Sequence, residues 1–275
     1  MRTLSLVGPG TADLLAPLSA ELDGRVATVR HDDAGATDAT LDDHHAAGPD
    51  DASGDANAAY RLADDGSWTG SGTDAEFGEI LDRLAPEFDY ALVAGFSKLR
   101  LPTVVVGDER VPGDVVERVD DAADLALDGL VAAVETSDPY VTLGTLVEEA
   151  KASENADRAG AIATFTGRVR VRDALDDDPT EALTFEKYEG VAAERMARIE
   201  RELEERDGVL DVRMHHRVGT VADGEDIVFV VVLAGHRTEA FRTVEDGINR
   251  LKDEVPIFKK ETTESEEFWV HERSE

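Results

Sequence analysis

Apolar residues in the first half of the chain occur in short runs that alternate with amphipathic stretches. The runs predict strands at residues 3–7, 25–30, 90–95 and 101–106. The stretches predict helices at residues 11–22, capped by Thr11, and at residues 74–84 and 115–133. Residues 34–72 are mostly Asp, Ala, Gly and Ser, which predicts a loop whose one ordered part is residues 58–62. Strands that alternate with helices predict an α/β domain with a parallel sheet.

The second half follows a different order. Strands are expected at residues 160–165, 182–188, 209–218, 226–234 and 268–270. Helices are expected at residues 140–150, 191–206 and 239–252, the last capped by Thr238. This order predicts an α+β sandwich with a mostly antiparallel sheet covered on one side. The break at Asp138-Pro139 divides the chain into domains 1–137 and 138–275.

Charge narrows the range of functions. The chain has a formal net charge of −33. General nucleic-acid binding is therefore excluded, because it needs a basic surface. Acidic residues are spread along the whole chain, and Arg outnumbers Lys 22 to 6. This composition is typical of proteins that stay soluble at very high salt, where self-repulsion is screened. We therefore expect a halophilic, cytoplasmic protein.

Several kinds of site and segment are not expected. The chain has no cysteine, which excludes disulfides, thiolate metal sites and cysteine nucleophiles. No signal peptide or membrane-spanning run is expected. Seven polar residues resemble metal ligands on paper, but their spacing follows no pattern of defined geometry. We expect that they bind no metal and that their side chains are solvated. They are His31, Asp32, Asp33, Asp42, Asp43, His44 and His45.

Half of the lysines lie in residues 251–261. Lys252, Lys259 and Lys260 fall within nine positions of one another. Pro256 should end the preceding helix, so Lys252 is expected in its last turn, on the inward side, with the other two on an extended segment. One interpretation is that they are favourable charges at a helix end. We favour the other, that this cationic cluster binds an anion.

Two more stretches offer groups for an anion. Alternation along a strand places Arg168, Arg170 and Arg172 on one face, where they repel unless water or an anion lies against them. His236 and Arg237 lie where a strand leads into a helix, and free N–H groups there favour an anion. That these two stretches and the lysines lie close together in the folded protein is a hypothesis.

Motifs in the first half resemble the molybdopterin-guanine dinucleotide biosynthesis adapter family, which has a P-loop fold. The resemblance rests on Gly8-Pro-Gly10, Thr28-Val-Arg-His31-Asp32, Ala59-Tyr60-Arg61 and residues 89–96. The family's Gly-Lys-Thr is replaced by Gly10-Thr11-Ala12, so the phosphate-binding lysine is missing. The resemblance implies a degenerate P-loop-like domain in which Gly8 and Gly10 bind no nucleotide.

Motifs in the second half resemble the large, catalytic subunit of molybdopterin synthase. The match covers residues 140–275 and rests on residues 160–167, 183–188, 216–219, 224–229, 236–241 and 251–261. By this resemblance Lys252 and Lys259 are catalytic. The residues expected to bind substrate are Arg168, Arg170, His236, Arg237, Lys260 and Glu261. Lys260 stands where relatives usually have Arg.

The resemblance implies an enzyme that transfers sulfur without a cofactor. A small ubiquitin-like sulfur carrier with a C-terminal Gly-Gly thiocarboxylate would deliver two sulfurs to cyclic pyranopterin monophosphate and form molybdopterin. Lys252 would act as general acid or base, and Lys259 would stabilise negative charge. A homodimer within a heterotetramer is implied. The alternative is a non-catalytic adapter that binds molybdopterin intermediates.

Overall fold

The computed structural model describes residues 1–31, 58–172, 178–187, 190–263 and 267–270. They divide into two compact units, Met1–Tyr140 and Val141–Glu275. Pro139 bridges to Arg2, and the Tyr140 N–H donates to the Met1 carbonyl at 2.7 Å. The chain therefore passes from one unit to the next three residues later than the proline break suggests.

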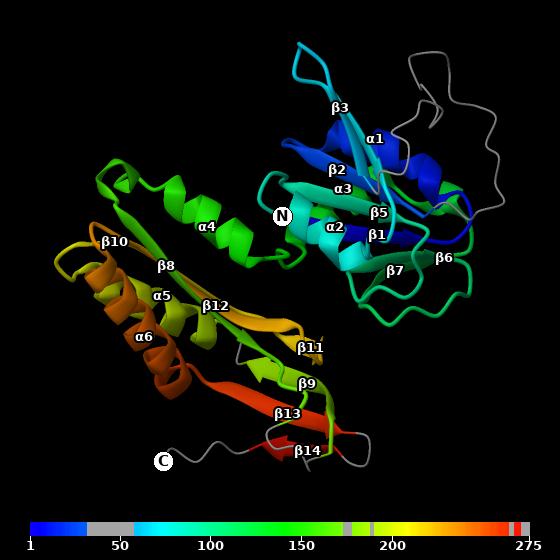
Figure 1. Ribbon diagram of the computed structural model, residues 1–275. Coiled ribbons are helices and arrows are strands. Elements are labelled where there is room, and N and C mark those ends of the chain that lie inside the picture. The colour runs from blue at the N-terminus through cyan, green and yellow to red at the C-terminus, as the bar shows by residue number, and fades with distance from the viewer. Residues whose placement is uncertain (32–57, 173–177, 188–189, 264–266, 271–275) are drawn as a thin grey trace. The chain divides into compact units, whose positions relative to one another are not determined.

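The first unit contains a five-stranded sheet and a separate hairpin (Figure 1). Its strands are β1 (Arg2–Val7), β2 (Val26–Arg30), β3 (Ala58–Leu62), β4 (Trp68–Gly72), β5 (Tyr90–Ala94), β6 (Thr103–Val106) and β7 (Val115–Val119). Its helices are η1 (Thr11–Leu14), α1 (Leu15–Glu21), α2 (Phe77–Leu84), η2 (Ala122–Asp124) and α3 (Leu127–Thr136).

The five-stranded sheet is parallel, as predicted, in the order β2-β5-β1-β6-β7. Leu4, Leu92 and Val104 from its central strands pack against Leu18 of α1 and Leu130 of α3. These side chains are fully buried, so burial of the alternating apolar residues on this face holds the unit together.

Three local predictions for this unit are wrong. Residues 115–133 are not one helix, because exposed strand β7 precedes η2 and α3. Thr11 does not cap a helix: Gly10 is the N-cap, and the Thr11 hydroxyl donates to the Gly8 carbonyl at 2.7 Å. Residues 68–72, predicted as loop, form β4, the partner of β3.

The second unit is α+β, and every strand pair among its described residues is antiparallel. Its helices are α4 (Leu143–Lys151), η3 (Ala156–Arg158), α5 (Val191–Glu204) and α6 (Arg237–Glu254). Its strands are β8 (Ala161–Arg168), β9 (Thr180–Lys187), β10 (Val209–His216), β11 (Gly219–Ala222), β12 (Asp226–Ala234), β13 (Ile257–Thr263) and β14 (Glu267–Val270).

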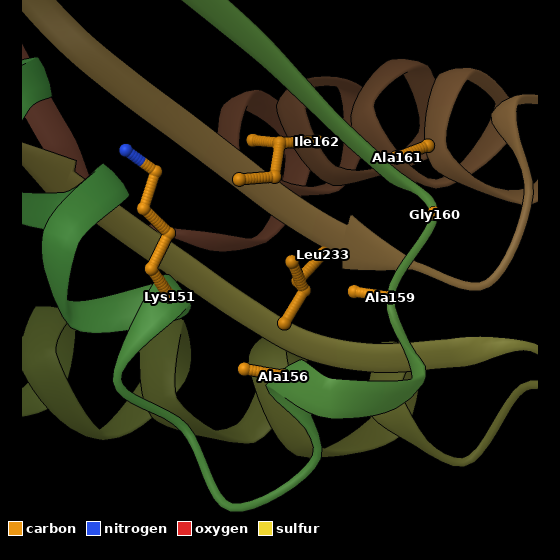
Figure 2. A pocket seen from close by; sticks show the side chains of 7 residues that line it. All are labelled: Lys151, Ala156, Ala159, Gly160, Ala161, Ile162 and Leu233. Atoms are coloured by element: carbon orange, nitrogen blue, oxygen red, sulfur yellow. The ribbon is translucent and has the colours of Figure 1, made fainter.

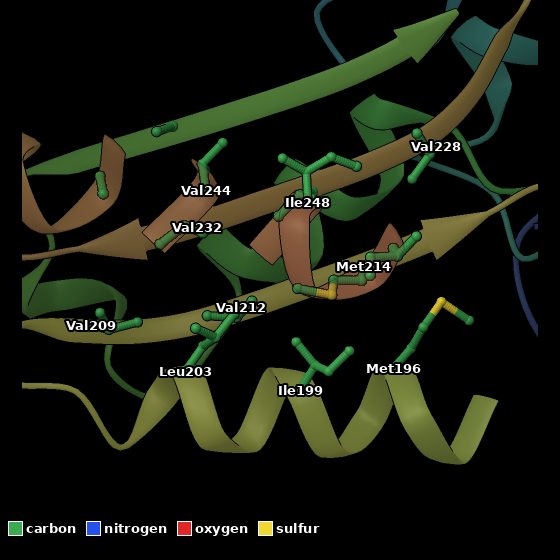
Figure 3. Close-up of a cluster of buried hydrophobic side chains, with 14 of the residues drawn as sticks. Met196, Ile199, Leu203, Val209, Val212, Met214, Val228, Val232, Val244 and Ile248 are labelled. Carbon is green, nitrogen blue, oxygen red and sulfur yellow. The ribbon is translucent and has the colours of Figure 1, made fainter. Parts of the chain in front are cut away.

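The strands form two sheets, β10-β12-β8 and β11-β9-β13-β14. Strand β12 is central in the first, as its apolar sequence predicts. Both faces of that sheet are covered, which corrects the predicted one-sided sandwich. Val230 and Val232 pack against α5 and α6 in the cluster of Figure 3, whereas Phe229, Val231 and Leu233 pack against Leu146 and Ala150 of α4.

Helix α6 begins at Arg237, with His236 as N-cap, and not at residue 239 after a Thr238 cap. It ends at Glu254, ahead of Pro256, as the proline predicts. No helix among the described residues is both long enough and apolar enough to cross a membrane.

Candidate active site

Lys259 and Lys260 lie on β13 and face opposite sides of its sheet. Lys259 pairs directly with Phe185 of β9, and Lys260 with Thr184. Directly opposed residues share a face, so Lys259 lies on the side of Phe185, which belongs to the buried cluster that Ile257 packs against. Lys260 lies on the side of Thr184, whose hydroxyl contacts that of Thr220 at 3.1 Å. The two lysines therefore cannot act on the same ligand atom from one face.

Glu261 is on the same face as Lys259, two residues further along β13. It accepts a hydrogen bond from the Thr180 hydroxyl at the start of β9. Glu261 is half-buried and pairs with Leu183. Its observed contact is thus structural, linking the end of β13 to the start of β9.

Arg168 and Arg170 lie at the end of β8. Arg168 is the last residue of the strand, and its Nε lies 3.2 Å from Asp226 Oδ1, its cross-strand partner; it also donates to the Gly224 carbonyl. Arg170 is exposed beyond the strand end, and the intervening Val169 is buried against Leu183 and Phe185. Arg170 and Arg172 lie outside β8, so the predicted single strand face of three arginines does not form.

Lys252 lies in the last turn of α6, as predicted, but its side chain is exposed. The buried face of α6 carries Ile248 and Leu251 instead. The predicted inward orientation is therefore wrong. Lys252 is a cation at the surface, close in sequence to Lys259, with only the end of α6, Pro256 and the start of β13 between them.

His236 and Arg237 are exposed at the other end of α6. Helices rise about 1.5 Å per residue, which puts the Arg237 backbone roughly 22 Å from that of Lys252. The sheet gives the same separation: β12 ends beside Ala161 at the start of β8, whereas Arg168 is at its far end. Within one chain the structure brings Arg168, Arg170, Lys252 and Lys259 to one end and leaves His236 and Arg237 at the other.

An ion-pair network that the sequence did not reveal fixes the end of α6. Arg250 Nε and Arg198 of α5 each donate to Glu254 at 2.6 Å, and Arg250 also donates to Glu202 of α5. Hydrogen bonds from Arg250 and Arg198 lower the pKa of Glu254 to about 2. The four-residue spacing of Arg250 and Glu254 is a sequence signal for the first pair; the contacts to α5 depend on how the helices pack.

A cavity of about 350 Å³ lies elsewhere in this unit, between the end of α4 and the start of β8 (Figure 2). It is lined by Lys151, Ala156, Ala159, Gly160, Ala161, Ile162 and Leu233. None of the predicted site residues lines it. Lys151 Nζ lies 2.7 Å from Glu148, so the one charged lining residue already has a carboxylate partner.

In the first unit the glycine loop is packed closely onto the sheet. A Cβ atom at Gly8, where φ is +116°, would lie 2.1 Å from the Val106 carbonyl oxygen. The loop needs glycine for this close approach. Of the seven residues that resemble metal ligands, all but His31 lie outside the described residues; the His31 ring packs edge-on against Phe96, 5.0 Å between centroids.

Comparison with known proteins identifies the family. The MoaE protein family model matches residues 142–254. A probable molybdopterin synthase from Haloferax volcanii is 56% identical over 274 residues, covering 99% of this chain and 100% of the relative. The molybdopterin synthase catalytic subunit of Pyrococcus abyssi is 36% identical and aligns over 45% of this chain and 82% of its own length.

A solved MobB protein homologue from Bacillus stearothermophilus aligns with 50% of this chain and 99% of its own length, at 20% identity and a TM-score of 0.33. This likeness is too distant to support an assignment of the first unit. The resemblance of residues 1–137 to the adapter family therefore stays a prediction. The likeness to the Haloferax volcanii protein extends over both units, and on that ground the chain belongs to the molybdopterin synthase family.

Proposed function

We propose that this chain is the catalytic subunit of molybdopterin synthase, with Lys252 and Lys259 as its catalytic groups. The observation that carries the proposal is the likeness to a named synthase over the full chain, combined with two lysines on either side of the turn between α6 and β13. The proposed setting is a salt-rich cytoplasm, in keeping with the net charge of −33.

The reaction transfers sulfur to cyclic pyranopterin monophosphate from the thiocarboxylate tail of a small ubiquitin-like subunit. Lys252, exposed at the end of α6, moves protons as general acid or base. Lys259, beside Phe185, stabilises negative charge that develops on the substrate. Arg170 binds its phosphate. Lys260, on the opposite face of β13 from Lys259, does not contact the substrate. Arg168 and Glu261 have their observed partners in Asp226 and Thr180, so they shape the site without contacting the substrate.

His236 and Arg237 join this site from a second copy of the chain. Within the described residues β8 pairs only with β12 and has an open edge, and no charged residue precedes Arg168 on it. Uncharged open edges readily pair with another strand. Antiparallel pairing of two β8 strands would set the Arg237 end of one copy beside the Lys252 end of the other, because the strand and α6 have similar lengths.

Exposed apolar side chains flank this edge. Phe241 is 66% and Ile162 38% exposed. At 100° per residue, Phe241 lies on the flank of α6 that carries Lys252, opposite the Arg250 side that meets α5. A second copy would cover both side chains, which explains why a helix that packs on β8 carries an exposed phenylalanine.

The test is turnover. The purified chain, a thiocarboxylated small subunit and cyclic pyranopterin monophosphate are mixed and assayed for the dithiolene of molybdopterin. Dithiolene formation is the expected result. Substrate binding without turnover would favour the alternative, a non-catalytic adapter that carries molybdopterin intermediates.

Mixing two inactive variants tests the shared site. Arg237→Ala and Lys252→Ala chains, unfolded together and refolded as a mixture, should regain about a quarter of wild-type activity, because half the dimers are mixed and each holds one intact site. A site built within one chain would regain none. The unmixed variants, refolded separately, are the controls.

A further inference from the structure

The β3-β4 hairpin of the first unit is a sheet of two strands. Tyr60 pairs with Gly70 and Leu62 with Trp68, and no other strand among the described residues joins either edge. An isolated two-stranded ribbon is at best marginally stable in water. Its order therefore calls for a contact beyond the hairpin itself.

One face of this hairpin is apolar and the other polar. Tyr60, Leu62 and Trp68 share a face, and they are 67%, 78% and 64% exposed. The Tyr60 ring lies over Gly70, where an added Cβ would be 3.0 Å from it, and its centroid is 6.2 Å from that of Trp68. The opposite face carries Arg61, Thr69 and Ser71. Such alternation is typical of a sheet with one face buried.

The segment that precedes the hairpin is acidic and poor in large apolar residues. Residues 32–57 include eight aspartates and a single large apolar residue, Leu41. Neither strand of the hairpin contains an acidic residue, although 61 of the 275 residues are Asp or Glu. Two copies of so acidic a chain repel each other over most of their surfaces. An apolar, acid-free face is where two such chains can meet without that repulsion.

We propose that the Tyr60–Leu62–Trp68 face binds the same face of a second copy of this chain. The three side chains expose roughly 400 Å² per copy, so two copies would bury roughly 800 Å², the range of weak contacts. A contact of this size forms as the chain concentration rises. Molar salt strengthens it by screening the acids and favouring apolar burial.

The absence of cysteine gives this contact a direct test. Leu62→Cys places one thiol on the apolar face, and the matched control Thr69→Cys places one on the polar face of the same hairpin. The full-length chains are treated at molar KCl with a short bis-maleimide. Leu62→Cys should crosslink to dimers at least about tenfold faster than Thr69→Cys. Equal rates would overturn the proposal. The test needs no catalysis, so it is independent of the proposed function.

Tryptophan fluorescence shows whether this face is buried by a second copy, buried by the same chain, or left exposed. In a Trp269→Phe background, Trp68 is the only tryptophan. Its emission should shift to shorter wavelength as the chain concentration rises, and Leu62→Glu should abolish the shift. Emission at short wavelength at every concentration would mean that the same chain covers the face. Emission at long wavelength throughout would mean that nothing does. Either result overturns the contact between copies.

Discussion

Lys252 is the residue on which the proposed chemistry depends most. Lys252→Ala should lower turnover by at least ~10²-fold, the usual contribution of a positioned acid–base group. Because the side chain is exposed, the fold and the melting temperature should be unaffected. Lys252→Arg should fail nearly as badly, since a guanidinium does not release its proton. Retention of most activity by Lys252→Arg would move the proton transfer to Lys259 or His236.

Lys259 and Lys260 form a matched pair for mutagenesis. They are adjacent, both half-buried, and on opposite faces of β13. Lys259→Ala should reduce kcat strongly, whereas Lys260→Ala should change kcat and KM only mildly, because its side chain lies on the opposite face. Steady-state kinetics of the two variants measure this difference. Equal loss of kcat would contradict the separation by face.

At the residue scale the sequence predicts strand alternation well and burial poorly. That Lys259 and Lys260 face opposite ways follows from the period of a strand alone. The inward orientation assigned to Lys252 is wrong because Leu251, its neighbour, occupies the buried stripe, and a shift of one residue on a helix is about 100°. The Glu261–Thr180 contact joins residues on neighbouring strands, so no local pattern reveals it.

At the scale of elements, the network around Glu254 holds the end of α6, and with it Lys252, against α5. The pKa of Glu254 is lowered to about 2 from 4.5. A carboxylate with a lowered pKa adds stability above its unfolded pKa and loses it as the pH falls through the folded value. Glu254→Gln should therefore lower the urea midpoint at pH 7, and the difference from wild type should shrink between about pH 4.5 and pH 2.

An exposed glutamate of the same helix serves as the control for that measurement. Glu245→Gln removes one charge from α6 and no contact of the network. It should leave the urea midpoint nearly unchanged from pH 7 down to pH 3. A pH-independent effect of Glu254→Gln would show that its role is packing and not charge.

Element types were predictable where the apolar pattern is long. The parallel sheet of the first unit and helices α5 and α6 follow from periodicity. Strand β7 was missed because its exposed VVERV sequence lies at a sheet edge and merges with the apolar stretch of α3. Strand β4 was missed because WTGSG has the composition of a turn. Its partner strand, not its own propensity, makes it a strand.

For the whole molecule, salt should govern stability. At tens of millimolar salt the Debye length exceeds about 10 Å, and repulsion among acids acts across the surface. With a net charge of −33, the melting temperature should rise steeply from low to molar KCl. Sodium sulfate at equal ionic strength separates screening from ion-specific effects. A flat profile would contradict the halophilic interpretation, which a full-length Haloferax volcanii relative supports.

The second unit should work alone. Every proposed catalytic residue lies beyond Val141, the first residue of that unit. A chain that begins at Val141 should fold and, given its small-subunit partner, turn over at nearly the full-length rate in concentrated solution. Loss of activity with an intact fold would show that the first unit contributes to the site or to substrate delivery.

The spatial arrangement of the cations could not be predicted from the sequence. The motifs indicate which cationic residues lie near the ends of elements, but the length of α6 decides which of those ends lie close together. The helix is 18 residues long. The distance along it from Arg237 to Lys252 is about the same as the length of β8. The packing of α6 along β8 and β12 (Figure 1) shows that these separations run along the same axis.

The length of α6 also has a genetic consequence. If two copies share each site, a chain that carries both Arg237→Ala and Lys252→Ala spoils both sites of any dimer it enters. Such an allele would be dominant, whereas either single variant would leave one working site in every mixed dimer. Two defective alleles with lesions at opposite ends of one helix would complement each other in the same cell.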